Sequence, residues 1–181
     1  MVSQMNDDRA DHTASLLTNE KVLATGGSYL NSVELFDPST RTWTRADYMN
    51  NSRHWHTATV LNNGKVLVAG EYGTDHYYLN SSELYDPSTG IWRKSGYMKT
   101  GRQLHTAPIL TNGKVLVAGG ENNVDGDLNS VELYDSSTET WTTIDNMNNK
   151  RTLHKASTLT NGTVLVTGGI YFSVLSGAEL Y

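Results

Sequence analysis

The chain contains no cysteine, three prolines and two phenylalanines, and it has no long apolar run. Without cysteine it has no disulfide, no thiolate metal site and no thiol nucleophile. No apolar stretch approaches the ~18 residues of a membrane-spanning helix, and residues 1–20 lack the apolar centre of a signal peptide. The formal net charge of -5, without a basic cluster, argues against nucleic acid as a partner. A cytoplasmic location is the default prediction, and an extracellular one applies if the chain is a fragment of a secreted protein.

The chain instead contains a sequence repeat of about 49 residues, present in almost four copies. The tryptophans Trp43, Trp92 and Trp141 are 49 residues apart. Each unit also carries Met-x3-Arg-x2-His and an apolar run ending in glycine. The last three units have an Asn-Gly turn where the first has Asn19-Glu20, and the first three contain Glu-Leu-Tyr-Asp-Pro-Ser-Thr or a close variant. A fixed period near 50 residues, with a Gly-Gly pair and a late Trp, predicts the blades of a β-propeller. The units cover residues of about 5–48, 49–97, 98–146 and 147–181 in one domain over 1–181.

Each unit predicts four short strands and almost no helix, because no segment has a 3.6-residue period. The Asn-Gly pairs, such as Asn63-Gly64, favour two-residue hairpin turns after the first strand. The second strand is apolar on both faces, as expected for a sheet packed between two neighbours. Asp-Pro-Ser-Thr favours a turn before the fourth strand. Because the tryptophan of that strand recurs in phase, we expect all three copies to be largely buried.

These marks resemble the kelch repeat over essentially the whole chain. The features that carry the resemblance are the Gly pairs such as Gly26-Gly27, the aromatic-Asp of the third strand, and the Trp that follows it. The resemblance implies an all-β, kelch-type β-propeller of about four blades of four antiparallel strands. Two departures are Glu71 after Gly70 and Ser136 in place of proline.

The fourth unit stops at Tyr181, before its Asp-Pro turn and Trp strand. The last blade is therefore expected to be incomplete, with the edge at residues 176–181 unpaired unless residues 1–4 cover part of it. Two alternatives stay open: an excerpt of a longer repeat array, or an open or strained arc of four blades.

Loops of unequal length favour one face of the propeller as the binding face. The first-to-second and third-to-fourth turns are nearly identical between units, whereas the other loops differ. Trp55 is distinctive because Asp11, Leu104 and Leu153 occupy the same position in the other units. The candidate binding residues are Arg53, Trp55, Tyr72, His76, Tyr77, Tyr78, Arg102, Arg151 and Tyr171.

Arginine and histidine each recur once per unit, at Arg53 and His56 for example, and each allows two interpretations. In kelch proteins that bind acidic peptides, an arginine near this place can point into the central pocket, so the resemblance implies a binding role. Pairing with the repeated glutamate is the alternative. A ring of histidines could hold a metal, but hydrogen bonds to the backbone of the neighbouring blade explain it better, so we predict no metal site.

The sequence therefore favours a non-catalytic interaction platform that binds a protein or peptide on the variable-loop face. The alternatives are a carbohydrate-binding or carbohydrate-active propeller with a glycan ligand, and a structural segment of a larger extracellular repeat protein. Copper chemistry of the galactose-oxidase kind needs a Cys-Tyr crosslink, which a chain without cysteine excludes. No catalytic constellation and no cofactor site are predicted.

Overall fold

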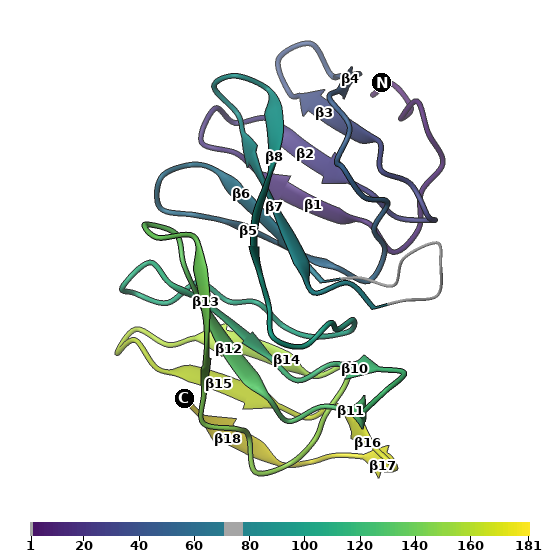
Figure 1. Cartoon of the computed structure of the whole chain (residues 1–181). Coiled ribbons are helices and arrows are strands. Elements are labelled where there is room, and N and C mark those ends of the chain that lie inside the picture. Colours follow the sequence, from purple (N-terminus) through teal and green to yellow (C-terminus); the bar gives the residue numbers. More distant parts are fainter. Residues whose placement is uncertain (1, 71–77) are drawn as a thin grey trace.

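The computed structural model describes residues 2–70 and 78–181, which fold into successive antiparallel blades without a helix (Figure 1). The first blade is β1 (Thr13–Leu16), β2 (Val22–Thr25), β3 (Val33–Asp37) and β4 (Thr42–Ala46). The second is β5 (Thr57–Val60), β6 (Val66–Ala69), β7 (Ser81–Asp86) and β8 (Ile91–Tyr97). The third is β9 (Val115–Ala118), β12 (Val131–Asp135) and β13 (Thr140–Ile144), and the fourth is β14 (Lys155–Thr158), β15 (Val164–Thr167) and β18 (Ala178–Leu180). The predicted all-β blade architecture is confirmed.

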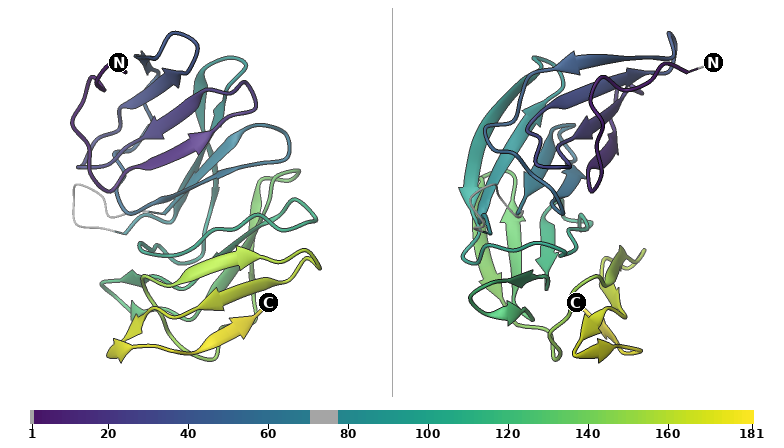
Figure 2. Two further views of the ribbon diagram at one scale, coloured as in Figure 1. Left: turned by 180° about the vertical axis from the view of Figure 1, so that it is seen from behind. Right: turned by 90° about the vertical axis from the view of Figure 1, so that its right-hand side faces the viewer.

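The blades follow one another along an open arc, with the first and last blades at its two ends (Figure 2). Within each sheet, each strand pairs with the next one along the chain, from the inner first strand to the outer fourth strand. Successive connections therefore alternate between two sides, which we call the turn face and the loop face. The loop face carries two small hairpins, β10 (Glu121–Asn122) with β11 (Gly126–Asp127), and β16 (Ile170–Tyr171) with β17 (Ser173–Val174). These hairpins lie on the right of Figure 1.

The inner strand of the third blade is reduced to isolated bridges, Thr106 with Ala118 and Ile109 with Val115. Pro108 stands in this strand, between those two bridges. Its nitrogen has no hydrogen to donate to the ladder, although its carbonyl still accepts from the Leu116 N–H at 3.0 Å. Because the inner strand is the edge of its sheet, the proline is tolerated there, and the position is the clearest departure from four regular strands per blade.

The core consists of three apolar layers, one between each pair of neighbouring blades. The second strand lies at the centre of its blade, and in β6 and β9 all four residues are buried. This explains the continuous apolarity of that strand, since each of its faces packs on a different layer. The blades are thus held together by neighbour-to-neighbour packing, as in other repeat proteins.

The three repeated tryptophans differ in burial. Trp92 is 8% exposed and packs on Tyr85, with ring centroids 5.0 Å apart, in the layer between the first and second blades. Trp141 is half-buried and donates from its indole Nε1 to Ser82 Oγ of the second blade at 3.2 Å. Trp43 is also half-buried. It belongs to the first blade, on the side away from the second. Full burial of this position therefore holds only for Trp92.

Replacing Trp92 with alanine is expected to lower the free energy of unfolding by about 3 kcal/mol, since it opens a cavity in an inter-blade layer. Urea unfolding at neutral pH measures the loss. Ile91→Ala is the matched control, because Ile91 precedes Trp92 on β8 and is exposed, and surface changes usually stay within about 0.5 kcal/mol. A loss below ~1 kcal/mol for Trp92→Ala would show that this layer does not hold the blades together.

At the C-terminal end, β18 pairs with β15 on one side. Among the described residues, no strand pairs with its other side. Residues 2–4 do not cover that edge, because Ser3 instead bonds to the first blade: its N–H donates to the Arg41 carbonyl and its Oγ accepts from the Trp43 N–H, both at 3.1 Å. The edge predicted to be open is therefore open in the folded chain.

Candidate functional site

The repeated arginines lie inside the blades and not on the loop face. Arg102 is fully buried, and its guanidinium donates to the carbonyls of Gly119 and Ser130 at 2.9 and 3.0 Å and to Glu132 Oε1 at 2.7 Å. The Glu132 carboxylate in turn accepts the backbone N–H groups of Lys99 and Thr100. The pair therefore ties the loop that enters the third blade to that blade's own sheet.

The same arrangement recurs in every blade, with salt bridges from Arg9 to Glu34, Arg53 to Glu83, and Arg151 to Glu179. Arg53, Arg102 and Arg151 have no exposed surface. Of the two interpretations of the repeated arginine, the structure therefore contains the pairing with the repeated glutamate. A guanidinium so enclosed does not meet an incoming partner, so Arg53, Arg102 and Arg151 are not binding residues of the loop face.

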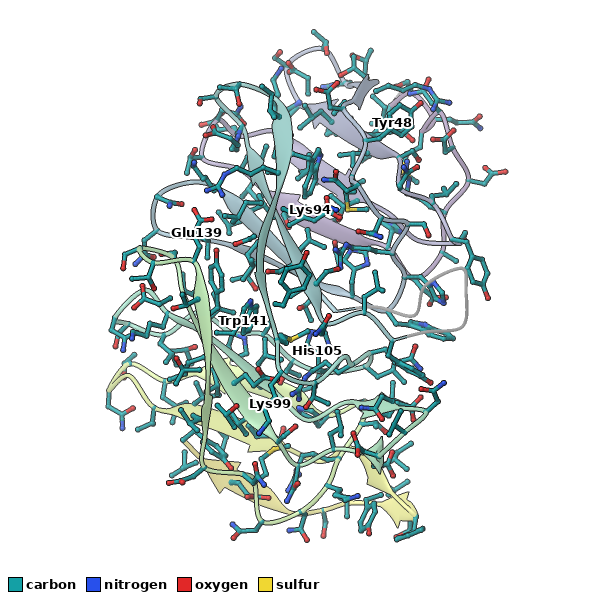
Figure 3. All side chains as sticks on the ribbon, viewed as in Figure 1. Tyr48, Lys94, Lys99, His105, Glu139 and Trp141 are labelled. Carbon is teal, nitrogen blue, oxygen red and sulfur yellow. The ribbon has the colours of Figure 1, made fainter. Side chains whose placement is uncertain are left out.

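The repeated histidines connect each blade to the one before it. His105 Nε2 lies 2.8 Å from Thr57 Oγ1, and His154 Nε2 lies 3.0 Å from Thr106 Oγ1. His56 Nε2 contacts Thr13 Oγ1 in the same way at 2.9 Å. Figure 3 shows His105 within the molecule, between the second and third blades. The partner is thus a hydroxyl group of the neighbouring blade, whereas a backbone group was expected.

Burial lowers the pKa of His56 to about 3 and of His154 to about 4, and the nearby Arg53 and Arg151 charges act in the same direction. Burial also lowers the pKa of His105 well below its usual value. These imidazoles are therefore neutral at neutral pH. In the described ranges 2–70 and 78–181, no group of three or more His, Asp or Glu side chains is arranged to hold a metal ion.

A ring of left-handed residues surrounds the axis on the loop face. Trp55, Leu104 and Leu153 have φ of 53°, 55° and 54°, which is uncommon for residues other than glycine. Each sits just before the histidine of its blade. Backbone bonds link the ring: the Trp55 N–H donates to the Asp11 carbonyl, the Leu104 N–H to the Trp55 carbonyl, and the Leu153 N–H to the Leu104 carbonyl, all at 3.3 Å. Backbone strain of this kind is held in place by the contacts between blades.

Trp55 stands in this ring beside two other aromatic residues. The His54 ring lies 4.5 Å from Tyr29 and 4.7 Å from Trp55, centroid to centroid. Trp55 is 40% exposed and Tyr29 is also exposed, whereas His54 is buried beneath them. Burial lowers the pKa of His54, which favours a neutral ring at physiological pH. His54 is not among the residues predicted from the sequence. Its signal was the variation at this position between units, where Ala10, Gln103 and Thr152 stand instead.

A second exposed apolar group comes from the β16–β17 hairpin. Phe172 is 91% exposed and its ring lies against that of Tyr171 in a tilted arrangement, with centroids 4.3 Å apart. The bridge between Thr152 and Ile170 joins this hairpin to the loop that carries Leu153, whose side chain is also exposed. The candidate Tyr171 is half-buried. The structure thus adds Tyr29, Leu153 and Phe172 to the residues that the sequence singled out.

The other candidates are placed as follows. Tyr72, His76 and Tyr77 lie outside the described residues, so this part of the predicted face carries no structural argument. Tyr78 is half-buried, and its carbonyl oxygen lies against Gly101 in the loop that enters the third blade. Gly70 keeps the left-handed φ of the first glycine in the other pairs, at 69°, whereas Glu71 after it lies outside the described residues.

Four antiparallel blades arranged around one axis, with regular turns on one face and differing loops on the other, define a β-propeller repeat protein. The family described as "KLHDC2/KLHL20/DRC7 Kelch-repeats domain" matches residues 2–169, and the chain belongs to this kelch-repeat family. The comparison with curated proteins found no match. Kelch repeats are generally protein-interaction modules without catalytic activity. Within the described residues, no helix has the length and apolarity needed to span a bilayer.

Proposed function

We propose that this kelch-repeat chain is a non-catalytic interaction module that binds a protein segment or peptide on its loop face, with Trp55 as the central anchor. The observation that carries the proposal is the position of Trp55 in the left-handed ring, where backbone bonds to Asp11 and Leu104 hold it. Leucine occupies the same place in the third and fourth units. The scaffold therefore accepts a smaller residue there, and the tryptophan serves something other than the repeat.

The surroundings of Trp55 favour an apolar or aromatic side chain as the group that is recognised. Tyr29 and Trp55 flank a buried neutral imidazole, and Leu153 and Phe172 add exposed apolar surface on the same face. Tryptophan and tyrosine supply large contact area at low entropic cost and dominate many protein interfaces. The net charge of -5 disfavours polyanionic ligands.

A glycan is the second candidate ligand, because the exposed Trp55 and Tyr29 rings could stack on the apolar face of a sugar ring. The two candidates differ in what else they need. A peptide gains affinity from a broad apolar contact that extends to Leu153 and Phe172, whereas a sugar needs polar groups beside the aromatic ring. The described neighbours of Trp55 on the ring, Asp11 and Leu104, offer one acidic side chain, so the peptide is favoured.

Binding on the loop face is tested by screening the protein against peptide and glycan arrays and then measuring the affinity of hits by calorimetry. Trp55→Leu, which inserts the residue of the equivalent positions, is expected to weaken a peptide hit by about 30-fold or more, as for a hot-spot residue. Phe172→Ser should weaken it by a smaller factor. Both variants should keep the unfolding temperature of the parent protein.

Ile91→Ala is the matched control, because Ile91 is an exposed apolar residue next to the third-to-fourth turn, on the turn face. It should leave the affinity unchanged. If Ile91→Ala weakens binding while Trp55→Leu has no effect, the ligand binds the turn face and the proposal fails. Hits on the glycan array alone, lost on Trp55→Leu, would replace the peptide with a sugar as the ligand.

A further inference from the structure

The two ends of the arc present the two halves of an interface that the chain already forms three times internally. We call the outward side of the first blade the front face and the outward side of the last blade the back face. The front face is formed by Leu16, Val22, Phe36 and Trp43. The back face is formed by Leu159, Leu165, Ala178 and Leu180. Inside the arc, the residues equivalent to these pack against each other in the inter-blade layers.

Burial differs sharply between internal and terminal copies of the same position. Leu84 of the second blade is 2% exposed, whereas Leu180, the equivalent residue of the back face, is 65% exposed. On the front face, Leu16 is 67% exposed, while Ile109, its counterpart in the third blade, is half-buried in a layer. The exposed residues are of the same apolar type as the packed ones, so both faces have retained the chemistry of an interface.

The backbone at the two ends of the arc also lacks the neighbours that it has inside the arc. At Gly119 of the third blade, a Cβ atom would lie 2.6 Å from the Arg151 carbonyl oxygen of the next blade. At Gly168, the equivalent glycine of the last blade, the corresponding position has only the Leu175 oxygen nearby, at 3.6 Å. The last blade thus keeps the glycine that a following blade requires. The backbone ladder of the ring also ends at the Asp11 N–H and the Leu153 carbonyl, which have no backbone partner among the described residues.

The N-terminal segment already occupies a place that belongs to a preceding blade. Counting from the methionine of each unit, Ser3 is equivalent to Gly96 at the end of β8. Gly96 lies against the Glu139 carbonyl of the following blade, and Ser3 donates to the Arg41 carbonyl, the equivalent group of the first blade. Residues 2–4 therefore take the place that the end of an outer strand of a preceding blade occupies elsewhere in the arc. In the last blade, the outer side of β18 is unpaired in the described chain.

We propose that a second copy of this chain covers both faces, with the back face of each copy packed on the front face of the other. Residues 2–4 of one copy would then run along the open edge of β18 in its partner. Ser81 pairs with Tyr97 at the corresponding place in the second blade. A head-to-tail contact that closes after two copies gives a ring with a twofold axis. It would contain twice four blades, which lies within the ~4–8 blades of known propellers.

Sedimentation equilibrium of the 181-residue protein over about a hundredfold range of concentration tests the proposal. The expected mass is twice the 20.0 kDa of one chain. Leu16→Asp and Leu180→Asp should each raise the dissociation constant by about 100-fold, because each places an unpaired carboxylate in both contacts of the ring. Both residues are exposed in the single chain, so the circular dichroism spectrum and the unfolding of the isolated chain should not change.

Mixing the two variants distinguishes the head-to-tail ring from other dimers. In a mixed dimer, Leu16→Asp and Leu180→Asp fall in the same contact and leave the other contact as in the parent protein. The equimolar mixture should therefore recover dimer that neither variant forms alone at the same concentration. Val124→Asp, at an 86% exposed position between β10 and β11, controls for the added charge and should leave the dimer intact.

Several results would overturn the proposal. A mass of one chain at every concentration would mean that a second copy does not cover these faces, as expected if further blades of a longer chain do. A mass that grows without limit would indicate an open polymer. A dimer that survives both substitutions, or that only one of them dissociates with no recovery on mixing, would place the contact elsewhere or make it symmetric.

Discussion

Acidification from pH 7 to pH 5 is expected to lower the free energy of unfolding by on the order of 4–6 kcal/mol, through three buried histidines. His56, His105 and His154 are each less than 7% exposed and contact a threonine hydroxyl of the preceding blade. Burial is the main reason why their pKa values are lowered, to about 3 for His56 and about 4 for His154.

The direction of the effect follows from the difference between the folded and unfolded chain. Above about pH 6.5 the imidazoles are neutral in both states, so stability does not depend on them. As the pH falls below this value, the unfolded chain binds a proton at each histidine while the folded chain does not. Each histidine then costs about 1.4 kcal/mol per pH unit until its folded pKa is reached. The loss can equal a large part of the stability of an ordinary domain.

Urea unfolding measured at intervals between pH 7.5 and pH 4.5 checks this expectation. His105→Gln keeps a polar group near Thr57 and should reduce the slope by at most about one third, because His12 and His54, whose pKa values are also lowered, contribute beside the three bridging histidines. His12→Gln is the matched control. His12 occupies the same position in the first blade but is only half-buried, so its removal should change the slope less. A flat profile between pH 6.5 and pH 5 would contradict neutral buried histidines.

The buried carboxylates affect the free energy of unfolding at lower pH than the histidines do, so the two contributions can be measured separately. Burial raises the pKa of Glu34, but the Asn6 N–H and the Arg9 guanidinium outweigh it, and the pKa is lowered overall. Glu179 behaves in the same way, with the Asn148 N–H and Arg151 as its partners. The stability that these charged groups contribute is present above the ordinary glutamate pKa and is lost as the pH falls further. Histidine variants should not alter this lower part of the profile.

Replacing Arg102 with alanine is expected to cost about 3–5 kcal/mol of unfolding free energy, because it leaves Glu132 buried without its charged partner. The carbonyls of Gly119 and Ser130 would lose a donor as well. Arg102→Lys keeps the charge but not the planar fork that reaches these acceptors, so a smaller loss is expected. Urea unfolding at pH 7 measures both variants.

The matched control is Arg93→Ala, which breaks the ion pair between Arg93 and Glu139 across the second and third blades. Both side chains of that pair are partly exposed, and such pairs contribute about 0–1 kcal/mol. The double variant Arg102→Met with Glu132→Leu addresses the buried pair further. It should remain destabilised, because the pair also satisfies backbone groups of the entering loop. A double variant as stable as the parent protein would show that the pair is dispensable for the fold.

The sequence by itself determined the repeat, the strand order within each blade and the family. These features are local: Asn-Gly and Asp-Pro-Ser-Thr specify turns within a few residues, and the apolar run between them has the length of a strand. The same reasoning identified Trp55, because its position could be compared with the equivalent positions of the other units. Repetition supplied an internal reference that a single blade would lack.

Only the tertiary structure decided what the repeated polar residues do. Arginine and glutamate of one unit lie 30 residues apart at Arg102 and Glu132, and a histidine and its threonine partner lie 48 apart at His105 and Thr57. Whether such residues meet depends on how loops fold back on a sheet and how blades pack on one another. Spacing along the chain therefore left both a binding role and a structural pairing open for the arginines, whereas their burial assigns them to the scaffold. The burial of Trp92, and the partial exposure of Trp43 at the end of the arc, arise from the same cause, because this side of a blade is covered only where another blade precedes it.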